Sequence, residues 1–290
     1  MKLHSTGRGG GYSVWRGLLE STLQLAYAGD WPARLWGALP FAAELAVTRH
    51  VVELPPGAGD SCRVAFVSDL HVGPTTPAAL LERTFERIRT EEPDVLLLGG
   101  DYVFLEAEPH RLATLGALVA SVPCPTKLAV LGNHDLWTDD GAIVQTLEDA
   151  GARVLVNEAT SLPHPFADVA VIGLDDPWTG LRDIEAALAG MNGELVRIVL
   201  CHSPDGLQQL AGTPFDLFLA GHTHGGQIAA PWGPLVLPHG PLCRSYPSGF
   251  DRFNEGTVYV SRGVGGVELP VRTFAPPDVL LLELRRPESQ

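Results

Sequence analysis

The sequence contains few cysteines, and no two of them lie close together. Four of its 290 residues are cysteine, and no pair is separated by only two residues. Cysteine pairs of that spacing hold structural zinc ribbons, so we expect no zinc ribbon here. A disulfide framework is not expected either, because four dispersed cysteines are too few for a chain of this length. We expect reduced cysteines, buried in or near strands.

A long apolar run is also missing. No stretch of about 18 or more uncharged apolar residues occurs, so the sequence predicts no membrane-spanning helix. Lys2 and Arg8 are followed by glycine and serine rather than by a compact apolar segment, and a single arginine is not a twin-arginine signal. We therefore expect a cytoplasmic protein, with peripheral contact to the inner face of the cell membrane as an open alternative.

Basic side chains are outnumbered by acidic ones. The chain has 20 lysines and arginines against 34 aspartates and glutamates, a net charge of -14. This excess argues against non-specific binding to long nucleic acid. The first fifty residues carry a small positive charge, so the acidity is concentrated in the remainder. We expect part of it to serve as metal ligands.

Five short polar motifs are present, each at the end of an apolar run. Together they supply aspartate, asparagine and histidine side chains sufficient to hold two divalent ions about 3.5–4 Å apart, as in two-metal hydrolytic sites. One such motif alone would carry little information, whereas five in series indicate metal-dependent hydrolysis. The motifs are Ser68-Asp69-Leu70-His71, Gly99-Gly100-Asp101, Gly132-Asn133-His134-Asp135, Cys201-His202 and Gly221-His222-Thr223-His224.

The segments around these motifs alternate between strand and helix patterns. This alternation predicts an α/β fold with mostly parallel strands that are buried on both faces. The motifs then follow the carboxyl ends of strands, where ligands bind in open α/β sheets. Residues 229–256 are rich in proline and glycine, and we expect a long functional loop there. Strands are expected at residues 63–68, 94–98, 126–131, 153–156, 169–174, 196–200, 215–220, 257–261 and 279–284, and helices at 77–91, 110–122, 141–150 and 181–188.

The N-terminal part has a different pattern. Residues 1–13 are glycine-rich, and we expect them to be disordered. Apolar residues at helical spacing predict helices over residues 14–28 and 32–47, the second kinked at Pro40. These helices either pack on the catalytic domain or on a second copy, or lie at a membrane surface through residues 14–47.

In their order and residue types, the motifs resemble those of the calcineurin-like metallophosphoesterase family, whose pattern reads D-x-H, G-D, G-N-H-[DE], H and G-H-x-H. Gly225-Gly226-Gln227 and Ser261-Arg262-Gly263 further resemble the bacterial YkuE/YaeI-type phosphodiesterase branch. The resemblance covers about residues 63–284. It implies a four-layer α/β/β/α metallophosphoesterase sandwich with an N-terminal helical extension, divided into an extension of residues 1–53 and a catalytic domain of residues 54–290.

The resemblance also implies roles for individual residues. Asp101 would bridge two divalent ions, which we expect to be Mn, Fe or Zn, with Mn favoured. His134 would be the general acid that protonates the leaving oxygen after attack by a metal-activated hydroxide. Asp135 either orients a neighbouring group or caps the following helical turn. The remaining ligands would be Asp69, His71 and His224 at the first metal, and Asn133, His202 and His222 at the second.

These roles predict a dinuclear metal-dependent phosphodiesterase that acts on a small-molecule or lipid-linked phosphoester. Alternatives are a UDP-diacylglucosamine-type lipid pyrophosphate hydrolase, or a non-catalytic scaffold on the same fold. The G-D motif continues as Tyr102-Val103 rather than D-R-G, which disfavours phosphoprotein substrates. Arg262 would either bind a substrate phosphate or form a structural ion pair.

Overall fold

The computed structural model describes residues 4–39, 44–55, 59–191, 193–210, 212–238 and 240–286. Within these ranges, two six-stranded sheets and a short hairpin account for the strands. The first sheet has the strand order β1-β14-β2-β3-β4-β5, and the second β12-β13-β9-β8-β7-β6. Their strands are β1 (Ala46–Glu53), β2 (Cys62–Val67), β3 (Val95–Leu98), β4 (Thr126–Ala129), β5 (Ala152–Val154), β6 (Glu158–Ser161), β7 (Val169–Gly173), β8 (Val196–Leu200), β9 (Leu217–Ala220), β12 (Gly249–Phe253), β13 (Gly256–Val260) and β14 (Asp278–Arg285), with β10 (Ala229–Ala230) and β11 (Gly233–Pro234) in the hairpin.

Most strand pairs are parallel, as predicted. In the first sheet β2 to β5 are parallel and β14 pairs antiparallel with β2. In the second, β7, β8, β9 and β13 are parallel, and the edge strands β6 and β12 are antiparallel to their neighbours. The motif-bearing loops therefore leave the same edge of each sheet.

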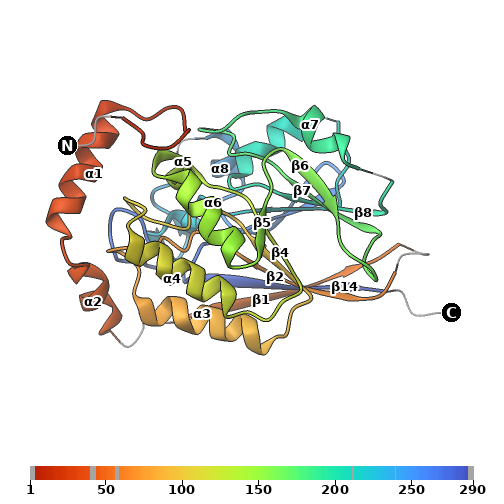
Figure 1. The fold of residues 1–290 in the computed structure, drawn as a ribbon, viewed down its shortest axis with the longest axis horizontal. Helices are drawn as coiled ribbons and strands as arrows, with labels where there is room; N and C mark the ends of the chain where they lie inside the picture. Colours follow the sequence, from red (N-terminus) through yellow and green to blue (C-terminus); the bar gives the residue numbers. More distant parts are fainter. Residues whose placement is uncertain are drawn as a thin grey trace.

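Three apolar cores divide the molecule into four layers (Figure 1). Alternate residues of β2 show the arrangement, because Phe66 packs between the sheets while Ala65 and Val67 face the first helical layer. The second helical layer packs on the other sheet through Ala187 and Leu207. The predicted α/β/β/α sandwich is confirmed. The helices are α1 (Val14–Ala26), α2 (Trp31–Gly37), α3 (Ala78–Thr90), α4 (Pro109–Ala120), α5 (Asn133–Trp137), α6 (Asp140–Asp149), α7 (Ile184–Ala189) and α8 (Pro241–Ser245), with the 3-10 helices η1 (Pro204–Leu210) and η2 (His224–Gly226).

The predicted disorder of residues 1–13 is wrong for residues 4–13, which form a strap against the catalytic domain. Gly9 donates a backbone hydrogen bond to Leu136 at 2.8 Å, and Arg8 binds the carboxylate of Asp175 with both terminal nitrogens, at 2.6 and 2.8 Å. A Cβ at Gly9 would lie 2.6 Å from the Leu136 carbonyl oxygen, so only glycine allows this approach. Figure 1 shows the strap running from the start of α1 toward α5. Residues 1–3 lie outside the described residues.

The predicted helix over residues 32–47 is also wrong in part. Helix α2 ends at Gly37, and residues 46–53 form β1, which pairs in parallel with β14 at the edge of the first sheet. The β-branched residues Val47, Thr48, Val51 and Val52 suit this strand, where alternate side chains face the core. Pro40 and its expected kink lie outside the described residues. The boundary between residues 53 and 54 stays a prediction.

The expected loop of residues 229–256 contains the β10–β11 hairpin, α8 and β12 in its described parts, so it is more regular than its composition indicates. No helix among the described residues is long and apolar enough to cross a membrane.

Candidate metal centre

The seven predicted ligands lie just after five strands, five of them in loops and two, Asn133 and His224, at the first positions of α5 and η2. Each loop begins where a buried apolar strand ends, so the strands of both sheets direct the polar side chains to one place. The backbone in these loops is sharply bent, with positive φ at Asp69, His71, Asp101, His222 and His224. Such conformations cost of order 1–3 kcal/mol each and gather at functional sites. Asp69 and His71 follow β2, Asp101 follows β3, Asn133 follows β4, His202 follows β8, and His222 and His224 follow β9.

The close approach of two of these loops depends on Gly221. A Cβ at this position would lie 2.1 Å from Asp69 Oδ2, so a larger residue would displace the carboxylate. The next residue, His222, donates its backbone N–H to Asp69 Oδ1 at 3.1 Å. The glycine of the Gly-His-Thr-His motif therefore lets the first and last motifs meet.

Asp69, His71 and His224 form the first cluster. His71 Nε2 lies 3.2 Å from His224 Nε2, and His224 Nε2 lies 3.4 Å from Asp69 Oδ1. One donor atom from each of the three residues lies within 4.8 Å of the others, which is close enough for a single ion to bind all three. All three residues are buried.

Asp101, His202 and His222 form the second cluster with the same closeness of donor atoms. Asp101 Oδ2 lies 3.1 Å from His202 Nε2 and also 3.6 Å from His71 Nε2 of the first cluster. The other oxygen, Oδ1, accepts the backbone N–H of His134 at 2.9 Å. One carboxylate therefore faces both clusters.

Hydrogen bonds behind the clusters fix the orientation of two ligands. His202 Nδ1 lies 2.8 Å from the Gly99 carbonyl, which can only accept, so the ring proton is on Nδ1 and Nε2 faces Asp101. Asp135 accepts backbone N–H groups from Gly132, Asp101 and Tyr102 at 2.7 to 2.9 Å. The sequence left open whether Asp135 caps a helical turn or orients a neighbouring group. In the structure it does both, because it caps α5 and holds the loop of Asp101.

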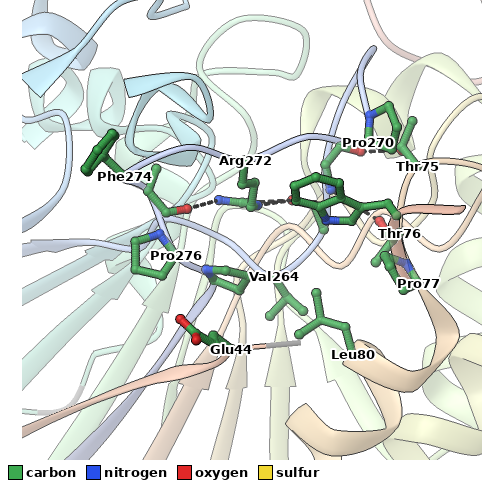
Figure 2. Close-up of a pocket in the computed structure, with 15 residues that line it drawn as sticks. Glu44, Thr75, Thr76, Pro77, Leu80, Val264, Pro270, Arg272, Phe274 and Pro276 are labelled. Carbon is green, nitrogen blue, oxygen red and sulfur yellow. Dashed lines mark hydrogen bonds between the residues drawn. The ribbon is translucent and has the colours of Figure 1, made fainter. Parts of the chain in front are cut away.

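Arg272 contacts His224 from the other side. Its Nη2 lies 3.0 Å from His224 Nδ1, and its other nitrogens donate to the carbonyls of Gly265 and Ala275. Figure 2 shows this side chain crossing the wall of a separate cavity of about 240 Å³. Burial lowers the pKa of Arg272 to about 10. Because a guanidinium only donates, a metal at His224 Nε2, which places the ring proton on Nδ1, requires Arg272 to move away from that atom.

The donor groups fit divalent ions in their protonation and in their unpaired atoms. Among the described residues, Asn133 Oδ1 and His222 Nε2 are buried without a hydrogen-bond partner. Burial lowers the pKa of His71 to about 4 and that of His222 to about 3, which keeps both rings in the neutral form that binds metal. Burial also raises the pKa of Asp69 to about 7, although the nearby charge of His202 opposes this rise.

His202 behaves differently from the other histidines. Burial favours its neutral form, but the carboxylate of Asp101 holds its pKa well above the usual value. At Asp101, burial acts to raise the pKa, but the neighbouring His202, His134 and His71 together hold it well below its usual value. These directions favour a proton on His202, and a metal ion would replace that proton. The mixed nitrogen and oxygen set suits Mn, Fe or Zn.

A cavity of about 480 Å³ opens onto the clusters. Its lining includes Asp101, Asn133, His134 and the two histidines of the last motif. Most of the other lining residues are apolar: Ile228, Val236, Leu237, Pro238, Val267, Leu269, Trp137 and Trp178.

The arginine in this cavity is not the predicted one. Arg262 is absent from the described residues that line it, and Arg262 Nε binds Asp278 Oδ2 at 3.1 Å, so its contact with substrate stays a prediction. Arg16 of α1 lines the cavity instead. Sequence reasoning missed Arg16 because its position depends on how α1 packs, and the only local signal was its spacing of four residues from Glu20.

Comparison with known proteins gives a second line of evidence on the function of this site. The family model described as Calcineurin-like phosphoesterase matches residues 62–226. Phosphodiesterase YaeI of Escherichia coli is 33% identical over 226 residues, covering 77% of this chain and 82% of that protein. The uncharacterized metallophosphoesterase YkuE of Bacillus subtilis is 29% identical over 245 residues, covering 82% and 85%. UDP-2,3-diacylglucosamine pyrophosphatase LpxG of Chlamydia muridarum is 27% identical over 280 residues, covering 76% and 82%. The matched range contains all seven predicted ligands and His134.

Proposed function

Because the chain belongs to the calcineurin-like phosphoesterase family and is a hydrolase of phosphoesters, we propose that it is a phosphodiesterase that works with two divalent ions. The observation that carries the two-ion proposal is the position of Asp101 Oδ2, 3.1 Å from His202 and 3.6 Å from His71. A carboxylate so placed can bind an ion in each cluster. The resemblance to YaeI supports the choice of a phosphodiester.

Each ligand has a task in this proposal. Asp69, His71 and His224 hold one ion, Asn133, His202 and His222 hold the other, and Asp101 bridges them. Two bound divalent ions supply a water of lowered pKa and positive charge to offset the phosphate oxygens. Asn133 contributes a neutral oxygen, which limits the negative charge of the site.

His134 is the proton donor to the leaving oxygen. Its backbone N–H binds Asp101, and its ring packs between Phe104 and Trp137 with centroids 5.5 and 5.6 Å away, so it is held firmly at the cavity wall. Burial lowers the pKa of His134 well below its usual value, and the charge of Arg16 adds to this against the pull of Asp101. An arriving phosphate anion offsets the positive charge of Arg16 and favours the protonated ring that this role needs.

The proposal is tested with metal-stripped protein and added Mn²⁺. We expect Mn²⁺ to restore hydrolysis of bis-p-nitrophenyl phosphate, with a smaller rate on p-nitrophenyl phosphate, because Mn²⁺ suits the mixed donor set. Fe²⁺ and Zn²⁺ are run in parallel, and p-nitrophenolate release is measured by absorbance. Two bound ions with no hydrolysis of either ester would instead support a non-catalytic scaffold.

A lipid-linked pyrophosphate is a second candidate substrate, of the UDP-diacylglucosamine type. The apolar residues that line the cavity together with the metal-ligand clusters favour it, and so does the similarity to LpxG. The phosphate group of such a substrate would lie at the clusters, and its acyl chain against the apolar residues.

We also propose peripheral contact with the inner face of the cell membrane. Helix α1 buries Gly17 and Glu20 against the protein, while Trp15 and Leu25 are 81% and 80% exposed. Trp31 and Leu35 of α2 are exposed as well. This apolar face is unusual for a helix packed on a domain, and the small positive charge of the first fifty residues suits anionic lipid.

Replacing Trp15 and Leu25 by serine is expected to weaken binding to phosphatidylglycerol-containing vesicles by at least ~10-fold, because each large apolar side chain contributes roughly 1.5–3 kcal/mol when buried. Co-sedimentation with the vesicles measures the effect. The control is Leu195→Ser, which removes a side chain of 46% exposure near the second sheet and should leave binding unchanged. Equal binding by the double variant and the wild type would contradict membrane contact through α1.

A further inference from the structure

From the position of Arg16 we infer that the N-terminal helix supplies a specificity-determining residue: Arg16 binds a second phosphate attached to the leaving oxygen, and so selects pyrophosphate-linked substrates over simple diesters. This inference rests on the proposed function, because it assigns His134 to the leaving side of the scissile bond. It adds a residue that lies outside the matched range of residues 62–226.

The location of the guanidinium relative to His134 carries the argument. Arg16 Nη2 lies 3.4 Å from His134 Nδ1 and 3.5 Å from its Nε2, so it sits against the ring. Arg16 is the only arginine or lysine among the described residues that line the cavity. If His134 protonates the leaving oxygen, the next group along the leaving fragment meets Arg16. A phosphate there matches the forked guanidinium.

The contacts of Arg16 hold it in place before any substrate arrives. Its Nε binds Glu20 Oε1 at 2.9 Å, and Tyr12 donates to the other Glu20 oxygen at 2.7 Å. The Glu20 side chain is only 5% exposed, so this support is shielded from water. The guanidinium also lies 5.1 Å from the ring centre of Trp137. A side chain ordered in advance loses less entropy when it binds an anion.

Glu268, the more exposed of the two carboxylates bound to Arg16, can be replaced by a substrate phosphate. Glu268 Oε1 lies 2.9 Å from Arg16 Nη1, but the Glu268 side chain is 37% exposed. An ion pair with that access to water contributes little to stability, so Glu268 can turn toward solvent when a phosphate takes its place. Glu20 stays and keeps the guanidinium oriented.

A purely structural role for Arg16 is the competing explanation. The Arg16–Glu268 pair joins α1 to the loop of residues 267–269, and Tyr27 donates to the Glu268 carbonyl at 2.7 Å in the same region. If the ion pair only holds α1 against this loop, both partners are needed, and replacing either one should change the kinetics in the same way. If Arg16 instead binds a substrate phosphate, Glu268 is not needed and competes with the substrate for the guanidinium.

Two matched substrates separate these roles in the Mn²⁺-loaded protein. Bis-p-nitrophenyl phosphate has one phosphate, whereas P1,P2-bis-p-nitrophenyl pyrophosphate differs from it only by a second one. Hydrolysis of the pyrophosphate uses one water, breaks the bridging P–O bond, and gives two molecules of p-nitrophenyl phosphate as the leaving oxygen takes up a proton from His134. Steady-state kinetics gives kcat and KM for each.

We expect Arg16→Gln to lower kcat/KM on the pyrophosphate at least tenfold more than on the diester. For Arg16→Lys, kcat/KM on the pyrophosphate should lie between the values for the wild type and Arg16→Gln, since lysine keeps the charge but not the forked geometry of the guanidinium. The lysine variant also replaces the glutamine variant in the test if the latter folds poorly. Glu268→Gln should lower KM for the pyrophosphate. The control is Arg34→Gln, an exposed arginine of α2, which should leave the ratio between the substrates unchanged.

Three results would overturn the inference: equal losses on both substrates in Arg16→Gln, a Glu268→Gln variant that behaves like Arg16→Gln, or a wild type that cleaves the diester but not the pyrophosphate. The last of these leaves the proposed phosphodiesterase intact. Failure of the wild type on both substrates would count against the proposed function itself.

Discussion

Asp101→Asn is expected to weaken the binding of both metal ions together, by ~100-fold or more. Residues that only hydrogen-bond to a metal ligand already contribute 10–100-fold to metal affinity, so loss of a charged ligand shared by both ions should lower the affinity at least as much. The amide keeps an oxygen that can accept the backbone N–H of His134, now 2.9 Å from Asp101 Oδ1, so the loop should keep its shape. What is lost is the negative charge of the atom that lies between His202 and His71.

The measurement is metal content after dialysis against a weak chelator, followed by titration calorimetry with Mn²⁺. Asp69→Asn is the matched control, because Asp69 belongs to the first cluster alone and its loss should affect chiefly one ion. Two tightly held ions in Asp101→Asn would rule out the bridging role. Loss of a single ion would place Asp101 in one cluster only.

Nine of the twelve strands in the two large sheets could be predicted because each is a short apolar run, and five of these runs end at a polar motif. The runs before Asp69 and His202 are both buried strands. Parallel pairing brings the motifs of each sheet to one edge, and the packing of the two sheets then brings the two edges together. Strands β1, β6 and β12 were not predicted, and β1 lies partly in the range expected to be helical.

The N-terminal part could not be predicted in the same way. The glycines of residues 7–11 have the composition of a disordered segment, but Gly7 and Gly9 are needed because the strap runs against the backbone of residues 136–138. Periodicity located helix α1, but it left open which face is buried, and in the structure Trp15 and Leu25 point outward. Arg16 and Glu268 are far apart in the chain, and no local pattern reveals that they meet.

His134→Ala is expected to keep both ions and to lose ~10²–10⁴-fold in kcat on a diester with an alkyl leaving group, the range that a positioned general acid contributes. The loss should be much smaller on bis-p-nitrophenyl phosphate, because p-nitrophenolate leaves without a proton. The contrast between the two substrates is the decisive observation, since damage to the metal site would lower both rates alike.

The structure supports this separation of metal binding from proton donation. His134 is hydrogen-bonded to the metal centre through its backbone N–H to Asp101, which alanine retains. Its ring lies beside that of His71, with centroids 5.0 Å apart, and also lines the cavity next to Arg16. His134→Gln is the companion variant, since it preserves side-chain volume without an acidic proton and should resemble alanine. Unchanged turnover of the alkyl ester in both variants would remove His134 as general acid, and would also remove the premise that places Arg16 beside the leaving group.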